Sequence, residues 1–286
     1  VSAFFDSFCF GGHRGSPLNA PENTLASFEQ AKNEGVDLIE FDVGFTKDFV
    51  PVLMHDVSLD RTTNMSGELN KYTLKELEQC NCTAKFRSLN SPEVVFVPEF
   101  ICTLENLIEW AIKNNIKMLF DVKNTEPNLV KQIVLLFESY NLFNKAIVCS
   151  FFPSVIYRIK RENQNILTGI TWRRWFISYE NMEFTVPRFS SKIIHYFAVS
   201  LDVLWVLSIK LWIPEFLGVD MVLTERREIS HWYLKLMNAR GLKVCAWTVN
   251  DRNEMALFSR KFKIPFLTDA PYIANHVLKN INSEKN

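Results

Sequence analysis

The stretch Ile39-Glu40-Phe41-Asp42-Val43 alternates between apolar and acidic residues. Successive side chains of a β-strand point to opposite faces, so Glu40 and Asp42 share one face and the apolar residues share the other. In a barrel the outward face packs on helices, and the inward face closes the interior. Two inward carboxylates are costly to bury unless a cation neutralises them. A divalent metal with oxygen ligands supplies such a charge, and an ion pair with a buried arginine or lysine is the alternative.

Strand-like and helix-like segments alternate along nearly the whole chain, which indicates an α/β protein with a parallel sheet. Strands are expected at Phe8–His13, Leu38–Phe45, Lys117–Val122, Ala146–Ser150, Leu167–Thr171, Val219–Leu223, Lys243–Val249 and Ile264–Thr268. Helices are expected at Thr24–Asn33, Thr103–Asn114, Asn128–Tyr140, Pro153–Arg161, Ile229–Ala239 and Asn253–Arg260. Eight strands with intervening helices, and no GxGxxG turn after the first strand, favour a (β/α)8 TIM-type barrel over an open doubly wound sheet.

Two segments depart from this alternation. Val50–His55 follows the second strand after only four residues, too few for a parallel crossover, so it should return as an antiparallel hairpin. Residues 56–100 are polar and should form a small insertion after the second strand, with one short helix at Thr73–Cys80. Residues 172–218 form a long apolar loop or insertion in the second half. We therefore expect a single barrel across residues 1–286 that carries both insertions.

Residues 193–217, within the second insertion, resemble a membrane segment in their apolar content. A spanning helix needs about 20 mostly apolar residues, and His195, Asp202 and Lys210 interrupt this run. An amphipathic helix lying in a membrane surface and an ordinary helix docked on the barrel are the other two interpretations. A membrane surface is therefore one candidate partner of the chain.

The charge balance argues against a nucleic-acid partner. The chain has 32 basic and 32 acidic residues and a pI near 7.1, so no overall field favours polyanions. Hydrophobic residues make up 48% of the chain, which is enough for a substantial core. Phe occurs 24 times, and this fits either a phenylalanine-rich core or a lipid-facing surface.

The six cysteines are scattered without a CxxC pair, so a zinc site built from cysteines is not expected. Three of them lie in apolar strand-like runs and are expected to be buried, namely Cys9, Cys149 and Cys245. The other three lie in or beside the polar insertion, where one disulfide could form in an oxidising compartment; these are Cys80, Cys82 and Cys102.

Two glycosylation sequons, which begin at Asn64 and Asn81, fall in the same insertion. They favour a glycoprotein whose catalytic domain is luminal or extracellular and membrane-associated. The sequence starts at Val1 without an ordered signal peptide, so we expect that a preceding segment has been removed.

Polar residues gather where the predicted barrel strands end. His13 and Arg14 end the first strand, His55 ends the hairpin, and Asp121 and Lys123 end the third barrel strand. Barrel enzymes build their active sites at this carboxyl-terminal face. A single histidine in an apolar strand is usually structural, but two histidines, several acids and two cations at one mouth point to catalysis.

This mixture of groups suits phosphodiester chemistry. Arg14, Lys123 and a metal would hold the non-bridging oxygens and absorb developing charge. One neutral histidine can remove the proton of the nucleophile, while the other, protonated, donates to the leaving alkoxide. The sequence has no GxSxG elbow and no phosphate-binding P-loop.

A series of motifs follows in order along the chain: His13-Arg14-Gly15, residues 20–24 (APENT), 35–43 (GVDLIEFDV), 46–48 (TKD), 51–56 (PVLMHD), 59–63 (LDRTT), Gly67, 121–123 (DVK), 247–250 (WTVN) and 268–271 (TDAP). Together they resemble the glycerophosphodiester phosphodiesterase family. The similarity extends from Gly12 to about Pro271, and its first third is highly specific. The long loop with its apolar stretch resembles, less specifically, the animal membrane-associated branch of that family.

The resemblance implies a TIM-type barrel, one divalent metal (Mg²⁺ or Ca²⁺) and a glycerophosphodiester substrate. By resemblance, the metal ligands are Glu40, Asp42 and Asp121, the acid–base pair is His13 and His55, the phosphate ligands are Arg14 and Lys123, and the pocket is shaped by Asn23, Thr24 and Trp247. Asp121 stands where many members have Glu. Phe49 replaces a usual Gly, so we expect a different turn there.

Two other functions remain open. A lysophospholipase D or sphingomyelinase D-like enzyme would use the same polar site beside an apolar groove, which residues 172–217 could supply, and would cleave a lysophospholipid. A catalytically silent, membrane-associated binding scaffold is the alternative from a different class. The leaving alcohol, and whether water or a substrate hydroxyl attacks, do not follow from the sequence.

Overall fold

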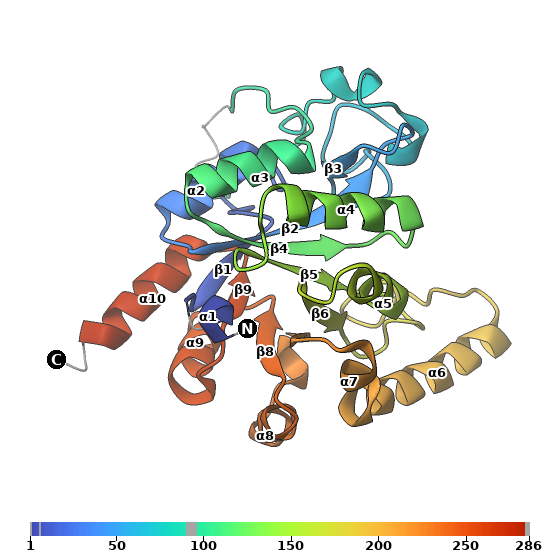
Figure 1. Cartoon of the computed structure of the whole chain (residues 1–286), viewed down its shortest axis with the longest axis vertical. Coiled ribbons are helices and arrows are strands. Elements are labelled where there is room, and N and C mark those ends of the chain that lie inside the picture. Colours follow the sequence, from blue (N-terminus) through green and yellow to red (C-terminus); the bar gives the residue numbers. More distant parts are fainter. Residues whose placement is uncertain (1, 6, 90–95, 284–286) are drawn as a thin grey trace.

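The computed structural model describes residues 2–5, 7–89 and 96–283 of the chain. Eight parallel strands close into a barrel, because β1 pairs with both β2 and β9 (Figure 1). The barrel strands are β1 (Phe10–His13), β2 (Leu38–Phe45), β4 (Lys117–Val122), β5 (Ala146–Ser150), β6 (Leu167–Trp172), β7 (Met221–Glu225), β8 (Lys243–Trp247) and β9 (Phe266–Thr268). The predicted TIM-type barrel is confirmed, and each predicted strand overlaps one of these strands.

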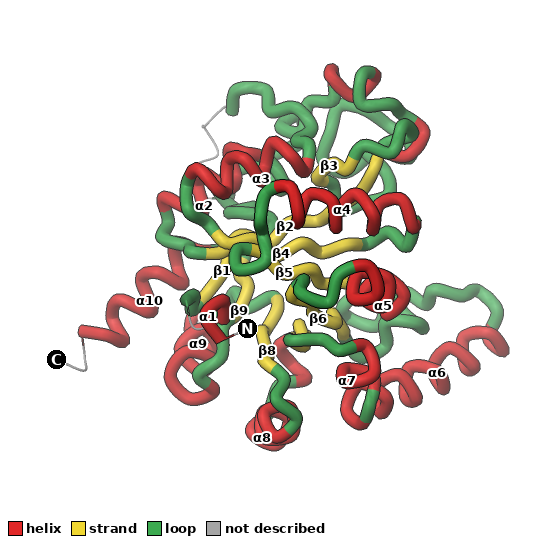
Figure 2. The backbone as a smooth tube through the Cα atoms, viewed as in Figure 1, coloured by secondary structure: helices red, strands yellow, loops and turns green. Residues whose placement is uncertain are grey.

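Most of the helices lie around the outside of the barrel (Figure 2). The α-helices are α1 (Ser2–Phe5), α2 (Leu25–Asn33), α3 (Leu104–Lys113), α4 (Pro127–Ser139), α5 (Pro153–Glu162), α6 (Lys192–Leu211), α7 (Ile213–Leu217), α8 (His231–Ala239), α9 (Arg252–Ala256) and α10 (Pro271–Ser283). Shorter helical turns are η1 (Leu69–Lys71), η2 (Glu76–Gln79), η3 (Arg226–Glu228) and the π-helix η4 (Leu257–Phe262). The predicted helix at 253–260 is divided between α9 and η4, and α1 and α10 were not predicted.

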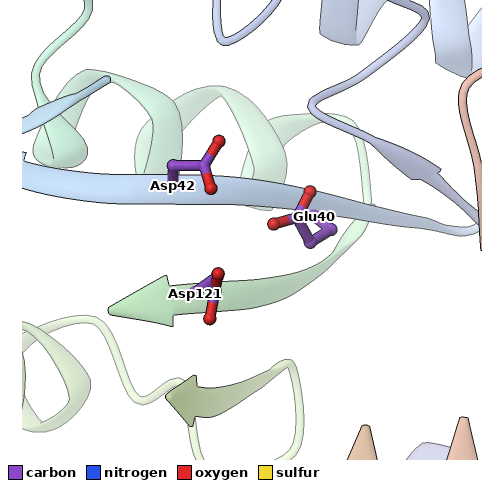
Figure 3. A group of neighbouring side chains, drawn as sticks. All are labelled: Glu40, Asp42 and Asp121. Atoms are coloured by element: carbon purple, nitrogen blue, oxygen red, sulfur yellow. The ribbon is translucent and has the colours of Figure 1, made fainter. Parts of the chain in front are cut away.

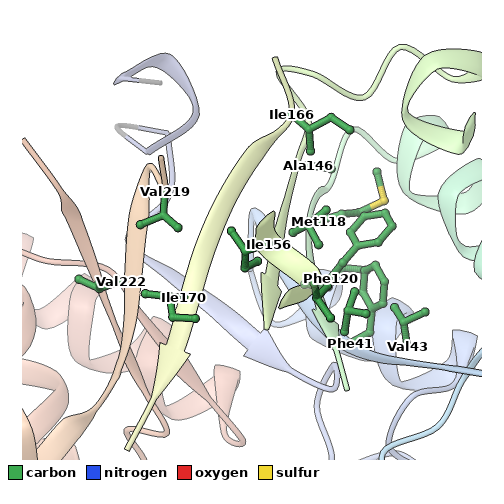
Figure 4. Close-up of a cluster of buried hydrophobic side chains, with 14 of the residues drawn as sticks. Phe41, Val43, Met118, Phe120, Ala146, Ile156, Ile166, Ile170, Val219 and Val222 are labelled. Carbon is green, nitrogen blue, oxygen red and sulfur yellow. The ribbon is translucent and has the colours of Figure 1, made fainter. Parts of the chain in front are cut away.

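The outward face of β2 carries the main core between the barrel and its helices. Ile39, Phe41 and Val43 are fully buried there. The ring of Phe41 lies 6.2 Å from Phe28 of α2 and 4.8 Å from Phe120 of β4, and Figure 4 shows Phe41 and Phe120 together in this cluster. The predicted alternation along β2 is therefore confirmed, since these apolar side chains all point away from the barrel interior.

The inward face of the strands forms a second, smaller core. Leu38, the first residue of β2, and Leu119, in the first half of β4, cluster with Phe4, Phe5 and Phe8 from the start of the chain. These apolar side chains fill the lower part of the barrel interior. The polar side chains that follow on the same strands therefore lie at the opposite, carboxyl-terminal end.

The predicted hairpin is confirmed. Strand β3 (Pro51–Leu53) runs antiparallel to β2, with Val43 opposite Leu53. The predicted short helix at Thr73–Cys80 is confirmed only in part, as the 3₁₀ helix η2 at Glu76–Gln79. A few residues cannot offset the entropic cost of nucleating an α-helix, and the insertion folds instead around a small apolar cluster that includes Leu77.

The expectation of a different turn at Phe49 is also wrong. Phe49 has φ 62°, the left-handed conformation that usually favours glycine. Its N–H donates to Thr46 O at 3.0 Å, and its ring stacks on Phe45 with centroids 5.5 Å apart. These contacts offset the cost of the backbone conformation.

All six cysteines are free thiols. Cys149 and Cys245 are buried as predicted, whereas Cys9 is exposed because it precedes β1 at the rim of the barrel. The disulfide considered among the cysteines of the insertion is not formed in this structure.

The apolar segment 193–217 forms α6 and α7, and α6 projects from the barrel (Figure 1). Among the described residues α6 is long and apolar enough to cross a membrane by length and composition. Much of its surface faces outward, with Ile193 82% and Phe197 66% exposed. Its one acid, Asp202, is buried and accepts hydrogen bonds from the N–H groups of Ile177 (2.8 Å) and Ser178 (2.9 Å). Asp202 thus ties α6 to the loop that follows β6.

Candidate active site

A cavity of about 520 Å³ lies at the carboxyl-terminal ends of the strands. Seven of the predicted site residues line it, namely His13, Arg14, Glu40, His55, Asp121, Lys123 and Trp247. Asp42 and Asn23 are buried beside it, and the side-chain amide of Asn23 donates to Asp42 Oδ2 at 2.8 Å. Asn23 therefore contacts the acidic residues and not the wall of the cavity.

Three carboxylates form a buried group that we call the acidic triad: Glu40, Asp42 and Asp121. Glu40 and Asp42 come from β2, and Asp121 comes from β4 at the position paired with Asp42 (Figure 3). One oxygen of each residue lies within 4.8 Å of the others. The close approach follows from the parallel pairing of β2 and β4, which places their inward side chains at the same height.

The charges of the triad are only partly neutralised by neighbouring cations. Lys123 Nζ lies 3.0 Å from Asp42 Oδ1 and from Asp121 Oδ2, and Arg14 Nε lies 3.2 Å from Asp42 Oδ2. Burial alone would raise the pKa of Asp42, but Lys123 and Arg14 hold it well below its usual range. Burial raises the pKa of Glu40 to about 7, against the opposing effect of His13.

The triad also has oxygen atoms without hydrogen-bond donors. Within the described part of the chain, the buried Asp121 Oδ1 has no hydrogen-bond partner, and Asp42 Oδ1 has only its ion pair with Lys123. A buried polar atom without a partner is costly. Three buried carboxylates, two of which have an oxygen without a hydrogen-bond donor, match the ligands that Mg²⁺ and Ca²⁺ prefer, so this group fits a divalent cation.

His13 is oriented by the carboxylate of Asp269, the residue that follows the last barrel strand, β9. Its Nδ1 lies 2.7 Å from Asp269 Oδ1, and Asp269 also accepts a hydrogen bond from Asn250 at 2.6 Å. The other ring nitrogen, Nε2, lies 3.9 Å from Glu40 Oε2. Burial alone would lower the pKa of His13, but Glu40 and Asp269 together raise it above its usual value.

His55 is oriented in a similar way, through a longer network. Its Nδ1 lies 2.5 Å from Asp56 Oδ1. Arg61 Nε donates to Asp56 Oδ2 at 2.6 Å, and the two terminal nitrogens of Arg61 donate to Glu22 at 2.8 and 2.7 Å. Glu22 in turn accepts a hydrogen bond from Arg14 at 3.0 Å. Arg61 therefore connects His55 with Arg14, two residues that both line the cavity.

Several of these contacts were not predicted. Glu22, Asp56, Arg61 and Asp269 all lie in quoted motifs, but sequence reasoning gave them no role. The rule that polar residues at strand ends build the site could have found Asp56 and Asp269. Thr24, expected to shape the pocket, instead caps α2 by accepting a hydrogen bond from Ser27 N.

The sequence of the chain matches the glycerophosphoryl diester phosphodiesterase family over residues 13–273. Glycerophosphodiester phosphodiesterase 1 of Homo sapiens is 33% identical over 261 residues, which cover 90% of this chain and 76% of that protein. The protein of the same name from Bos taurus is 35% identical over 263 residues, with 90% and 76% covered.

Solved structures show the same fold at lower sequence identity. A putative glycerophosphoryl diester phosphodiesterase from Silicibacter pomeroyi superposes with a TM-score of 0.74 at 17% identity, covering 95% of this chain and 93% of that one. A phosphodiesterase from Oleispira antarctica, solved in complex with the product sn-glycerol-3-phosphate, gives a TM-score of 0.70 at 22% identity, with 94% and 96% covered.

Proposed function

This chain belongs to the glycerophosphoryl diester phosphodiesterase family, and on that premise we propose that it hydrolyses glycerophosphodiesters to glycerol phosphate and an alcohol. The observation that carries the proposal is one cavity that brings together the acidic triad, two carboxylate-bound histidines and two cations. A phosphodiester is anionic and resists attack, so its hydrolysis needs positive charge beside the phosphate and groups that transfer protons. The cavity has groups of both kinds.

The acidic triad would hold one divalent cation, Mg²⁺ or Ca²⁺. The unsatisfied oxygens of Asp42 and Asp121 and the raised pKa of Glu40 support this, because a cation would relieve both. When bound, the ion would polarise a phosphoryl oxygen and neutralise charge that develops on it. The proposal therefore predicts that the activity of the enzyme depends on divalent cations.

Arg14 and Lys123 would bind the non-bridging oxygens of the phosphate. Both side chains line the cavity and already lie beside the triad through their ion pairs with Asp42. Their charges remain at neutral pH, since burial alone would lower each pKa but neighbouring carboxylates, Asp42 for Arg14 and Asp121 for Lys123, raise it above its usual value. The two cations would therefore orient the phosphodiester between the histidines.

His13 and His55 would transfer the protons. If each Nδ1–H donates to its carboxylate, Nε2 of each ring is left to exchange a proton at the cavity. One neutral imidazole removes the proton of the nucleophile, and the other, protonated, donates to the oxygen of the leaving alcohol. If water is the nucleophile, glycerol phosphate forms directly; if a substrate hydroxyl attacks, water must then open the resulting cyclic phosphate to give the same product.

Replacement of each histidine tests these roles. We expect His13→Ala and His55→Ala each to lower kcat by about 10²–10⁴-fold, the usual contribution of an acid–base group. His276→Ala is the matched control, because His276 is exposed on α10, away from the cavity. A wild-type rate in either site variant, or an equal loss in the control, would contradict the proposal.

A lysophospholipid is the second candidate substrate, cleaved in the manner of a lysophospholipase D or sphingomyelinase D. The aromatic side chains of Phe151, Phe152 and Phe176, which line the same cavity, support this alternative. Assaying glycerophosphocholine and lysophosphatidylcholine side by side separates the two substrates, because they differ only in the acyl chain. Turnover of the lysolipid alone would exclude the water-soluble diester as substrate.

We further propose that α6 rests on a membrane surface, with the catalytic domain on the luminal or extracellular side. The exposed face of α6 is apolar, including Phe197 and Leu204, and it carries no negative charge because the one acid of the helix, Asp202, is buried. Phe197→Asp with Leu204→Asp should abolish co-sedimentation with anionic phospholipid vesicles. Leu135→Asp, on an exposed apolar position of α4, should not, and equal sedimentation of all variants would contradict the proposal.

A further inference from the structure

The far side of the cavity, away from the acidic triad, has a different chemistry from the catalytic side. It is lined by the loop that follows β6, with Arg173, Phe176, Glu180 and Arg188. This loop has no part in the acid–base or metal chemistry described above. Its position in the same cavity suggests contact with the part of the substrate beyond the phosphate.

Two guanidinium groups occupy this side without a carboxylate partner. Arg173 is buried and donates to the carbonyl oxygens of Tyr179 (2.7 Å) and Glu180 (3.1 Å), and Arg188 donates to those of Phe176 (3.2 Å) and Tyr179 (3.3 Å). Within the described part of the chain, neither has a carboxylate oxygen within 4.0 Å. Backbone carbonyls hold these cations in place but do not neutralise their charge.

Two neighbouring arginines that do not line the cavity each have a carboxylate partner. Arg174 pairs with Glu228 at 2.8 Å, and Arg227 pairs with Glu225 at 2.9 Å. Burial, followed by the nearby charge of Arg188, lowers the pKa of Arg173, as expected where two like charges are close. An anion placed beside them would relieve this repulsion.

An aromatic wall connects the two sides of the cavity. Arg173 and Arg188 lie 5.6 and 5.7 Å from the ring centroid of Phe176. Phe176 stacks on Phe151 at 4.6 Å, and Phe151 meets Trp247 edge-on at 5.6 Å. A group attached to a phosphate beside the catalytic residues can therefore extend along this wall towards the two arginines.

We propose that this side of the cavity is a subsite for a negatively charged leaving alcohol, in particular one that bears a carboxylate, and that Arg188 binds the charge. The proposal rests on the proposed function, since it specifies the alcohol released at the same site. Glycerol is neutral, so only the other alcohol of a glycerophosphodiester can carry this charge. Arg173 contributes charge from its fixed position, whereas Arg188 is exposed and has nitrogen atoms left for a ligand.

The exposed carboxylate of Glu180 lines the same side. Glu180 has no side-chain ion pair among the described residues, so it is available to an ammonium group. An alcohol that carries both an ammonium and a carboxylate, as serine does, fits this arrangement better than one that carries an ammonium alone.

The test compares glycerophosphoserine with glycerophosphoethanolamine, whose leaving alcohols differ only by the serine carboxylate. Both kcat/KM in the active enzyme and Kd in the His55→Ala variant are measured. We expect the wild-type enzyme to favour glycerophosphoserine by about 10-fold or more, at the lower end for a charge-assisted contact because Arg188 is exposed. In Arg188→Gln this preference should fall about 10-fold. The fall should come from a lower kcat/KM for glycerophosphoserine, while the value for glycerophosphoethanolamine stays unchanged.

Two further variants serve as controls. Arg188→Lys keeps the charge and should restore part of the preference, and Arg174→Gln should leave it unchanged, because Arg174 pairs with Glu228 and does not line the cavity. If Arg188→Gln folds normally and keeps the wild-type preference, or the wild type shows none, the subsite is wrong although the enzyme is active. If no diester is cleaved but Arg188→Gln still weakens binding of glycerophosphoserine, the subsite stands and the proposed function fails.

Discussion

Arg61 connects the two halves of the proposed catalytic machinery. It makes four hydrogen bonds of 2.6 to 3.3 Å to Asp56 and Glu22, the carboxylates that hold His55 and Arg14. In Arg61→Gln both carboxylates lose their shared donor, so a proton-transfer group and a phosphate ligand lose their common support. Arg61 itself does not line the cavity, and its replacement leaves every proposed catalytic group present.

The size of the effect should differ between activity and stability. Removing a group that orients catalytic residues commonly costs about 10- to 100-fold in activity, and we expect a loss of kcat/KM in this range. The side chain of Arg61 is 47% exposed, and solvent-exposed ion pairs contribute only about 0.2–1 kcal/mol to stability. Asp56 and Glu22 also keep His55 and Arg14 as partners. Activity should therefore fall far more than the free energy of unfolding.

Steady-state kinetics and urea unfolding of the same preparations measure the two effects. Arg61→Lys should be intermediate, since a single ammonium keeps the charge but cannot bridge both carboxylates. Arg161→Gln is the matched control, because Arg161 is exposed on α5, away from the site. A wild-type kcat/KM in Arg61→Gln, or a loss explained by the unfolded fraction alone, would refute this reasoning.

Three other predictions address the remaining parts of the site. Asp269→Asn should lower kcat about 10- to 100-fold with unchanged circular dichroism, because it removes the charge that orients His13; a wild-type rate would show that Asp269 has no such role. Chelation should abolish turnover, and added Mg²⁺ or Ca²⁺ should restore it, whereas activity that persists in excess chelator would contradict a metal at the triad. The hydrogen bond from His55 lowers the pKa of Asp56 below its usual value; Arg61 adds to this effect and burial opposes it. The ionised Asp56 carboxylate therefore contributes to stability above about pH 4, and this contribution is lost as the pH falls. Asp56→Asn should therefore flatten the decrease in Tm over that acidic range, and an identical pH profile would contradict this assignment.

The sequence predicted the features that depend on short-range patterns. The two-residue period at 39–43 placed Glu40 and Asp42 inside the barrel, because side-chain direction in a strand is set by sequence position alone. The convergence of the strand ends then follows from parallel pairing. The local pattern thus predicted that Glu40 and Asp42 point inward and that Asp121 lies at the same end of the barrel, whereas the grouping of all three as one metal site was implied by the family resemblance.

Other features depend on contacts that no local pattern encodes. Arg61 reaches Glu22 across 39 residues of sequence, through an insertion whose path is set by its own apolar cluster. At Phe49 the steric rule that favours glycine was overridden by stacking on Phe45. Helix α10 is different, since Ile273, Val277 and Ile281 recur at a helical spacing of four. The sequence therefore contained the helical pattern of α10, although this helix was not among those predicted.

Product analysis by ³¹P NMR tests the central claim most directly. Wild-type enzyme is incubated with a glycerophosphodiester and a divalent cation, beside the His13→Ala and His55→Ala variants. We predict that the diester resonance is replaced by that of glycerol phosphate with the wild-type enzyme, and that both variants leave the diester essentially unchanged. No glycerol phosphate from any diester with either Mg²⁺ or Ca²⁺, or equal product from the histidine variants, would contradict it.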